Sequence, residues 1–151
     1  MNKVITTKIP SQSLLKARVK ADDFADCYLV ESEISVRRAA EIIIDFPLWA
    51  RGLMRLRNVL TSPFGLSAGD TPAVEKLGIF PIEAENANEI IAGFNDKHLN
   101  FRISVLSLEG KIFLSTWVHP HNWGGRMYLK TILPFHILIS KNALIRVSAV
   151  K

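Results

Sequence analysis

The spacing of hydrophobic positions changes along the chain, and each spacing predicts a different element. An apolar run from Phe24 to Val30 predicts a first strand. Ser35 stands at an N-cap position before apolar residues at helical spacing over residues 36–44, which predicts a first helix. Pro47 ends this helix and suits the first turn of a second one, which reaches the turn at residues 62–65. The apolar face of the second helix is expected to carry Trp49, Leu53, Leu56 and Leu60.

Four strand-like runs follow, and a long helical pattern comes last. The runs cover Gly78–Glu85, Glu89–Phe94, His98–Leu108 and Lys111–His121. Glu109 and Gly110, between the last two runs, predict a tight hairpin turn. Helical spacing extends from Trp123 to about Val147, and Pro134 is expected to kink this helix. Its predicted apolar face carries Tyr128, Ile132, Phe135, Ile139 and Ala143.

This order of elements predicts the fold class. Sequential strands joined by tight turns form an antiparallel sheet, and a long helix with an apolar face must pack on one side of it. We therefore expect an α+β helix-grip fold, in which a curved antiparallel sheet wraps around the C-terminal helix and two short helices follow the first strand. A cavity often lies between such a sheet and helix. Residues 1–20 are expected to form a flexible lead-in, and residues 21–151 a single domain.

The predicted hairpin turn determines which residues face each other. With Glu109 and Gly110 as the turn residues, Leu108 faces Lys111 and Arg102 faces Trp117. One face is then apolar and should meet the last helix. The opposite face is polar and carries three histidines: His98, His119 and His121. These are close enough to share a transition metal, but an ordinary polar face is the preferred interpretation, so we assign no metal ligand and no cofactor.

Composition excludes several classes of protein. With 48% hydrophobic and 22% charged residues in 151, the chain is neither disordered nor fibrous. A single cysteine, Cys27, excludes an intramolecular disulfide and a multi-cysteine zinc site, and it fits a reducing compartment. Neither a secretory signal nor an apolar stretch long enough for a membrane span is visible. We therefore expect a soluble, cytoplasmic protein.

The net charge of +5 is unevenly distributed. Residues 1–20 carry five positive charges and no acid, and residues 110–151 carry six positive charges and no acid. A basic C-terminal segment suits an anionic ligand, a membrane surface or nucleic acid, whereas a solvated helix face is the plainer interpretation. Aromatic residues are not interleaved with basic ones along the strands, so nucleic acid is not an expected partner.

Candidate chemistry lies on and just before the last helix. His136 stands on or beside its apolar face, after Pro134. A histidine there can hydrogen-bond a ligand, act as acid or base, or bond to a carbonyl freed by the proline. Asn122 or Gly125 is placed to cap the helix, and Arg126 beside exposed amides suits a carboxylate or phosphate.

Several short motifs together resemble a bacterial family of unknown function. They are Pro47-Leu48-Trp49, Leu56-Arg57-Asn58, Pro63-Phe64-Gly65-Leu66, Gly78-Ile79-Phe80-Pro81, His98-Leu99-Asn100-Phe101-Arg102, Gly125-Arg126-Met127-Tyr128-Leu129 and Pro134-Phe135-His136. The resemblance covers roughly residues 18–147 and implies the helix-grip fold of the START and polyketide-cyclase (SRPBCC) superfamily. Members mostly bind apolar small molecules under the last helix, and a minority are enzymes. A related domain follows an NAD(P)-binding domain in longer chains; this chain lacks the glycine-rich motif, so such a partner would act in trans.

We therefore predict a protein that binds an apolar or amphipathic small molecule between the sheet and the last helix. The expected ligand contacts are Phe101, Ile103, Leu114, Val118, Arg126, Tyr128, Ile132, Phe135, His136 and Ile139. One alternative is a cyclase-, isomerase- or hydrolase-type enzyme in which His136 is the acid or base and Tyr128 or Arg126 stabilises an oxyanion. Another alternative is a protein-interaction module, whose partner is a second copy of the chain or a separate NAD(P)-binding oxidoreductase. Trp117 and Trp123, if exposed, would anchor that partner.

Overall fold

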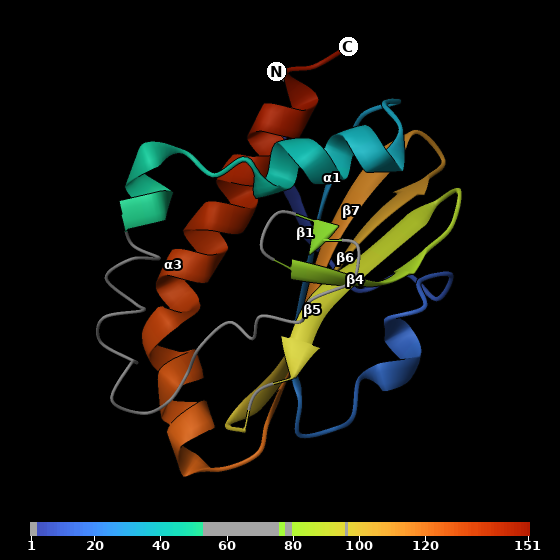
Figure 1. Cartoon of the computed structure of the whole chain (residues 1–151). Coiled ribbons are helices and arrows are strands. Elements are labelled where there is room, and N and C mark those ends of the chain that lie inside the picture. Colours follow the sequence, from blue (N-terminus) through green and yellow to red (C-terminus); the bar gives the residue numbers. More distant parts are fainter. Residues whose placement is uncertain (1–2, 53–75, 78–79, 96) are drawn as a thin grey trace.

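The structure, a computed structural model, describes residues 3–52, 76–77, 80–95 and 97–151 (Figure 1). Its strands form one antiparallel sheet in the order β1-β2-β7-β6-β5-β4-β3. Their bounds are β1 Ile5–Thr7, β2 Phe24–Glu31, β3 Lys76–Leu77, β4 Phe80–Glu85, β5 Glu89–Asn95, β6 Leu99–Leu108 and β7 Lys111–Pro120. The helices are the 3-10 turn η1 Lys16–Arg18, α1 Val36–Ile44 and α3 Trp123–Ser148. Residues 48–52 are also helical.

The predicted fold class is confirmed. The chain forms an α+β fold with a curved antiparallel sheet, a long C-terminal helix, and two short helices after β2, the first strand that the sequence predicted. The part of the second helix expected beyond residue 52 lies outside the described residues. α3 runs on through Pro134, and the kink expected there stays a prediction.

Local signals in the sequence explain where the helices begin. The Ser35 hydroxyl accepts a hydrogen bond from the Arg38 backbone N–H at 3.2 Å, so it caps α1 as predicted. The Asn122 side chain accepts one from the Gly125 N–H at 2.9 Å and caps α3. Of the two capping residues that the sequence offered for α3, Asn122 is therefore the one that acts.

The β6–β7 hairpin has the predicted register. Leu108 pairs with Lys111, and Arg102 pairs with Trp117. Glu109 and Gly110 both have positive φ, 51° and 70°, which is the requirement of the two-residue turn that matches the twist of the strands. The register places alternate side chains of β6 and β7 on opposite faces of the sheet, an inner face toward α3 and an outer face.

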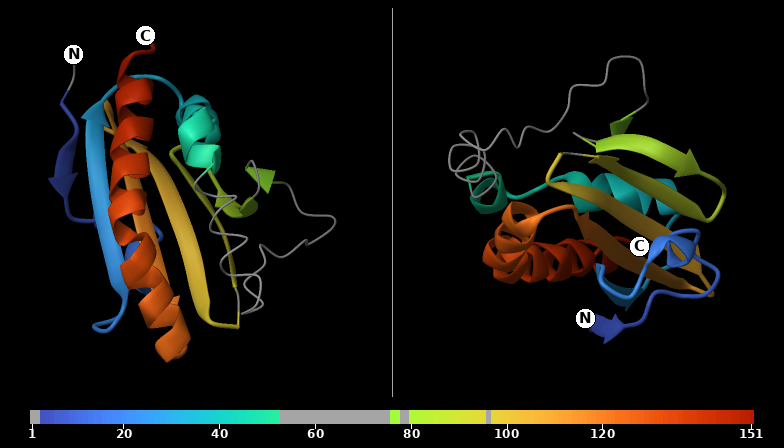
Figure 2. Two further views of the ribbon diagram at one scale, coloured as in Figure 1. Left: turned by 90° about the vertical axis from the view of Figure 1, so that its left-hand side faces the viewer. Right: turned by 90° about the horizontal axis from the view of Figure 1, so that it is seen from below.

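The inner face is covered by α3 and α1. α3 packs across β2 and β7, and α1 lies beside the C-terminal half of α3 over β5 and β6 (Figures 1 and 2). The core between them is apolar and includes Tyr28, Val30, Ala39, Ala40, Ile43, Val105, Ile112, Ala143, Leu144 and Val147. Small residues on α1 and α3 let the two helices approach the sheet closely.

The outer face is covered by residues 8–20, which we call the N-terminal strap. Figure 1 shows its turn η1 on the side of the sheet opposite α3. A second apolar core joins Ile9 and Leu15 of the strap to Cys27, Ile91 and Trp117 of the sheet. Residues 1–20 were expected to be a flexible lead-in. In their described part, the chain instead supplies the edge strand β1 and this packed cover.

The face that α3 turns toward the sheet differs from the predicted one. Buried positions on α3 are Gly125, Ser140, Ala143, Leu144 and Val147. Of the predicted apolar face only Ala143 is among them, and Phe135 is 46% exposed. Apolar side chains lie all around α3, so their spacing alone does not single out one face.

Candidate functional site

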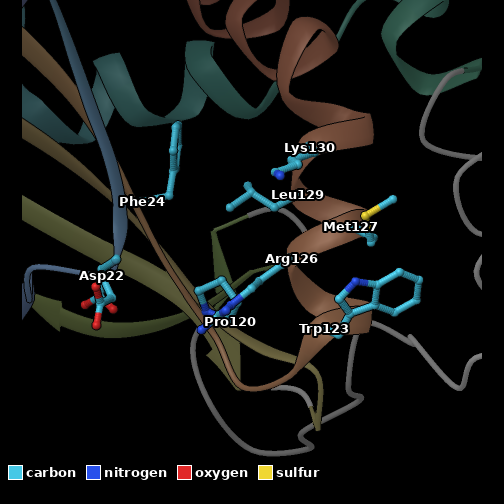
Figure 3. A pocket seen from close by; sticks show the side chains of 9 residues that line it. Asp22, Phe24, Pro120, Trp123, Arg126, Met127, Leu129 and Lys130 are labelled. Carbon is cyan, nitrogen blue, oxygen red and sulfur yellow. The ribbon is translucent and has the colours of Figure 1, made fainter.

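A pocket of about 480 Å³ lies between the first turns of α3, the start of β2 and the end of β7 (Figure 3). Its volume falls in the range of roughly 300–1,000 Å³ that is usual for small-molecule sites. Its walls are formed by Asp22, Asp23, Phe24, Pro120, Trp123, Arg126, Met127, Leu129 and Lys130. Arg126 is the one residue of this lining that belongs to the predicted ligand contacts.

A close approach of α3 to the sheet sets the position of the helical wall. A Cβ built on Gly125 would lie 2.2 Å from the His98 carbonyl oxygen, so a larger residue cannot occupy this position without moving the backbone. The His121 N–H donates to the same carbonyl at 2.8 Å. The helix therefore starts directly after β7, and its first two turns stand over Pro120 and the start of β2.

The two walls of the pocket differ in chemistry. Arg126, Leu129 and Lys130 extend from α3 toward Phe24 and Pro120, while Trp123 and Met127 lie toward the other side of the helix (Figure 3). Phe24, Leu129 and Pro120 offer apolar surface. The helical wall carries two cations, and within the described residues neither has an ion-pair partner.

Asp23, the more buried of the two acids in the lining, already has other partners. Asp23 accepts hydrogen bonds from the Lys20 backbone N–H at 3.0 Å and from Trp117 Nε1 at 2.8 Å, and it pairs with His119 Nδ1. Burial opposes ionisation of this carboxyl, but these hydrogen bonds outweigh it and hold the pKa of Asp23 below its ordinary value. Asp22, the second acid of the lining, is exposed, and among the described residues it forms no ion pair with Arg126 or Lys130.

A second polar group, the pair of Asp26 and His136, lies next to the Phe24 ring. His136 Nε2 is 2.9 Å from Asp26 Oδ2, with the two side chains 18% and 14% exposed. The Phe24 ring packs edge-on against the His136 ring, with centroids 6.1 Å apart. Asp26 Oδ1 is buried and has no hydrogen-bond partner among the residues that the structure describes. Phe24 therefore lines the pocket on one side and touches the histidine of an Asp–His pair on the other.

Tyr28 of β2 and Lys141 of α3 lie next to this polar group. Burial and the neighbouring Asp26 carboxylate raise the pKa of the Tyr28 phenol. The Lys141 ammonium lies 5.7 Å from the centre of the Tyr28 ring, within cation–π range. Between β2 and α3, Asp26 therefore interacts with both the His136 imidazole and the Tyr28 phenol, and this set of three groups can hold a proton or orient a polar ligand group.

The other predicted contacts lie deeper or further along α3. Ile103, Leu114 and Val118 are buried on the inner face of the sheet. Phe101 is half-buried and packs against Phe80 and Phe94, with ring centroids 5.5 and 5.6 Å apart. Tyr128, Ile132 and Ile139 are half-buried on α3. None of these residues lines the pocket described above.

The sequence contained a signal for Asp26 that the prediction did not use. In the register of β2, Phe24, Asp26 and Tyr28 alternate onto the inner face. An acid at an inward position between two aromatic residues needs a partner, and His136 is the histidine that the helix supplies. Lys130, four residues after Arg126, was also missed, although the i, i+4 spacing places both cations on one side of α3.

The three hairpin histidines have separate partners. His98 Nδ1 lies 3.2 Å from Asn122 Oδ1, His121 Nε2 lies 2.9 Å from Asn100 Oδ1, and His119 is held by Asp23. Within the described ranges, no three His, Cys, Asp or Glu side chains are placed to hold a metal ion.

Two outer-face residues, Trp117 and Cys27, are buried. Trp117 is 7% exposed and lies under Arg18, whose guanidinium carbon is 6.0 Å from the indole centre, so it cannot serve as an exposed anchor. Of the two expected anchors, Trp123 alone is exposed. Cys27 is a core residue, and burial raises the pKa of its thiol to about 11, which leaves it unreactive at neutral pH.

None of the helices in the described part of the chain is long and apolar enough to cross a membrane.

Comparisons with known proteins give a family. Neither the curated proteins nor the solved structures include a match to this chain. A family model does match, over residues 19–143, and its description is "Protein of unknown function (DUF2867)". Because this match covers most of the sequence, the chain belongs to the DUF2867 family.

Proposed function

We propose that the protein binds an amphipathic small molecule with an anionic end in the space between the sheet and α3. The observation that carries this proposal is the pocket of about 480 Å³, which joins an apolar surface to a helical wall with two cations. Such a combination of an apolar surface with a few polar groups is typical of small-molecule sites. The order of elements also supports membership of the START and polyketide-cyclase superfamily.

The two ends of the ligand would meet different residues. The anionic end would lie at Arg126 and Lys130, near the positive end of the α3 dipole. The apolar part would lie against Phe24 and Leu129. A longer ligand would pass Phe24 and reach Val118, which is its partner in the β2–β7 register, and the inner-face contacts that the sequence predicted.

The first test is native mass spectrometry of freshly purified protein, in which a non-covalent adduct of a small organic molecule is expected. The second is titration with laurate, dodecanol and dodecyltrimethylammonium, which share a chain and differ in head charge. We expect laurate to bind most tightly. Equal affinity for all three would contradict recognition of an anionic end.

Matched variants locate the site. Arg126→Gln should weaken laurate binding roughly fivefold, a modest loss because this cation is solvent-exposed. Arg38→Gln, on α1 and far from the pocket, should leave the affinity unchanged. Leu129→Trp should abolish binding in a folded protein by filling the pocket, and Ile132→Trp should do so only if the ligand extends along α3. Unchanged affinity in both tryptophan variants would exclude this site.

A second candidate function is that of an enzyme using the Asp26–His136 pair. The observation that favours it is the 2.9 Å contact between His136 and a carboxylate that fixes its orientation. His136 would be the acid or base, and a substrate would need to displace Phe24. If the wild type hydrolyses p-nitrophenyl butyrate, His136→Gln should abolish the activity, and equal turnover by the variant would exclude this role.

A further inference from the structure

The outward side of α3 carries an aligned series of exposed apolar residues, which we call the apolar stripe. It consists of Trp123, Met127, Leu138 and Ile145, with exposed fractions of 76%, 44%, 55% and 44%. Their separations of 4, 11 and 7 residues place them on one side of a helix. This side is opposite the buried Ala143 and Val147. The stripe extends over about 33 Å at the usual rise per residue.

Exposed apolar residues are common when they occur singly, but an aligned set is typical of an interaction surface. The stripe is uninterrupted by acidic side chains, because α3 contains none. Lys130 and Lys141 stand along one border of the stripe, on the side of β2. The surface is thus apolar with a positive border, and it calls for a partner that is apolar and negatively charged.

A second copy of the chain does not meet this requirement. If two stripes packed against each other, in either direction, neither helix would offer an acid to the lysines of the other, because α3 contains no acidic residue. A bilayer containing anionic lipids meets both conditions. Helices that combine Trp and Leu on one side with lysines beside them lie in the plane of the lipid headgroups.

We propose that the apolar stripe docks α3 on the surface of a bilayer that contains anionic lipids. Met127, Leu138 and Ile145 enter the boundary between headgroups and acyl chains, and Trp123 lies at headgroup level. Lys141, on the border of the stripe, lies nearest the lipid phosphates, and Lys130, which extends toward the pocket, adds attraction over a longer distance; both contributions fall off within a Debye length. The protein lies on the membrane through one helix and does not cross it.

Docking in this orientation bears on the pocket as well. Trp123 and Met127 belong both to the stripe and to the pocket lining. The pocket mouth therefore adjoins the surface that meets the bilayer. If the proposed function holds, an anionic amphiphile passes between bilayer and pocket with little exposure of its apolar chain to water. This last step rests on the proposed function, whereas the docking itself does not.

The test is co-sedimentation of the full chain with vesicles. Vesicles of phosphatidylcholine alone should bind little protein, and vesicles that also contain phosphatidylglycerol should bind most of it, with the bound fraction falling as salt is added. The double variant Trp123→Ser, Leu138→Ser should lower the apparent affinity roughly tenfold or more, because two inserted side chains are lost. Leu14→Ser is the matched control, since Leu14 is 54% exposed on the strap, on the opposite side of the sheet.

Each contrary result has a distinct meaning. No binding to anionic vesicles, or equal binding by the wild type and the double variant, overturns docking through the stripe. A concentration-dependent dimer that the double variant abolishes overturns it in favour of a second copy. Laurate titration without vesicles separates the two proposals, because retained laurate binding with no vesicle binding removes the docking surface and leaves the pocket.

Discussion

The two faces of the sheet are both covered, but by different means. The inner face packs against helices through apolar side chains, from Tyr28 and Val105 to Leu144. It also opens into a pocket at one end. The outer face is covered by the strap, and hydrogen bonds to buried charged groups hold that cover in place. The inner side is therefore the one with space for the ligand that we propose, whereas the outer side is closed by its cover.

The outer-face bonds centre on Glu89 and Arg102. The Glu89 carboxylate accepts hydrogen bonds from the Ser13 and Ser104 hydroxyls and from the Leu14 N–H at 2.9 Å. The Arg102 guanidinium donates to the Phe94 and Phe101 carbonyls at 2.9 and 2.7 Å. Hydrogen bonds to charged groups are the stronger ones, and their geometry is specific. The Glu89 bonds to Ser13 and Leu14 therefore fix the position of the strap more narrowly than apolar packing does, whereas the Arg102 bonds stay within the sheet.

The largest expected effect on stability comes from creating a cavity in either core. Leu144→Ala on the inner side and Leu15→Ala on the outer side should each lower the free energy of unfolding by about 2–5 kcal/mol, because both side chains are fully buried. Urea denaturation measures both. The matched control is Leu14→Ala, which should change stability by no more than about 0.5 kcal/mol. A Leu15 variant as stable as the Leu14 variant would show that the strap is not a second core.

A smaller effect is expected from Glu89→Gln. The substitution keeps the shape of the side chain but replaces one carboxylate oxygen by an N–H₂ group. That group can only donate, and it would face the donors of Ser13, Leu14 and Ser104. We expect a loss of about 1–3 kcal/mol, because one buried donor is left without its partner. Stability is measured by urea denaturation, and amide exchange at Leu14 reports whether the strap opens. Unchanged exchange at Leu14 would be inconsistent with Glu89 as the fastening point.

Acid should weaken the outer face through Asp23. Its pKa is lowered in the folded protein, so its stabilising contribution is present above the unfolded-state pKa of about 3.9 and is lost as the pH falls through the folded value. Asp23→Asn should therefore lose less stability than the wild type on acidification below about pH 4. Asp22→Asn is the control and should follow the wild type. Identical acid profiles for all three proteins would refute the assignment.

The smallest effect on stability is expected at the pocket. Arg126→Gln should change the free energy of unfolding by no more than about 0.5 kcal/mol, because Arg126 is exposed and has no ion-pair partner among the described residues. The same variant should weaken laurate binding, which isothermal titration measures. A large loss of stability would show that Arg126 supports the fold instead of the site.

The same two faces show how far the sequence predicts this molecule. Alternating apolar residues and the Glu109-Gly110 turn predicted the hairpin, its register and its inner face, because these depend on local chemistry. The cover of the outer face was not predicted. Its apolar residues, such as Ile9 and Leu15, stand at irregular intervals in a basic segment with no strand or helix period, so only the assembled sheet shows what they contact.

The site was predicted less well than the fold. Of the residues that the sequence proposed, Arg126 lines the pocket and His136 lies on the same helix, in contact with Phe24. The sequence did not identify Phe24 or Asp26 opposite them, because pairing β2 with α3 needs tertiary information. Which residues of α3 face the sheet also depends on how the helix is rotated about its own axis. Because α3 carries apolar side chains on all sides, its sequence does not indicate this rotation.

The strap also has a consequence for the order in which the chain folds during synthesis. Residues made early must find partners made much later, since Ser13 bonds to Glu89 and Asp23 to His119, separations of 76 and 96 residues. The outer face therefore stays uncovered until β7 has left the ribosome, although the strap left it first. Such distant contacts slow folding and extend the interval in which apolar surface is open to other chains. A nascent chain stopped before β7 should consequently depend on chaperones more than the finished protein does.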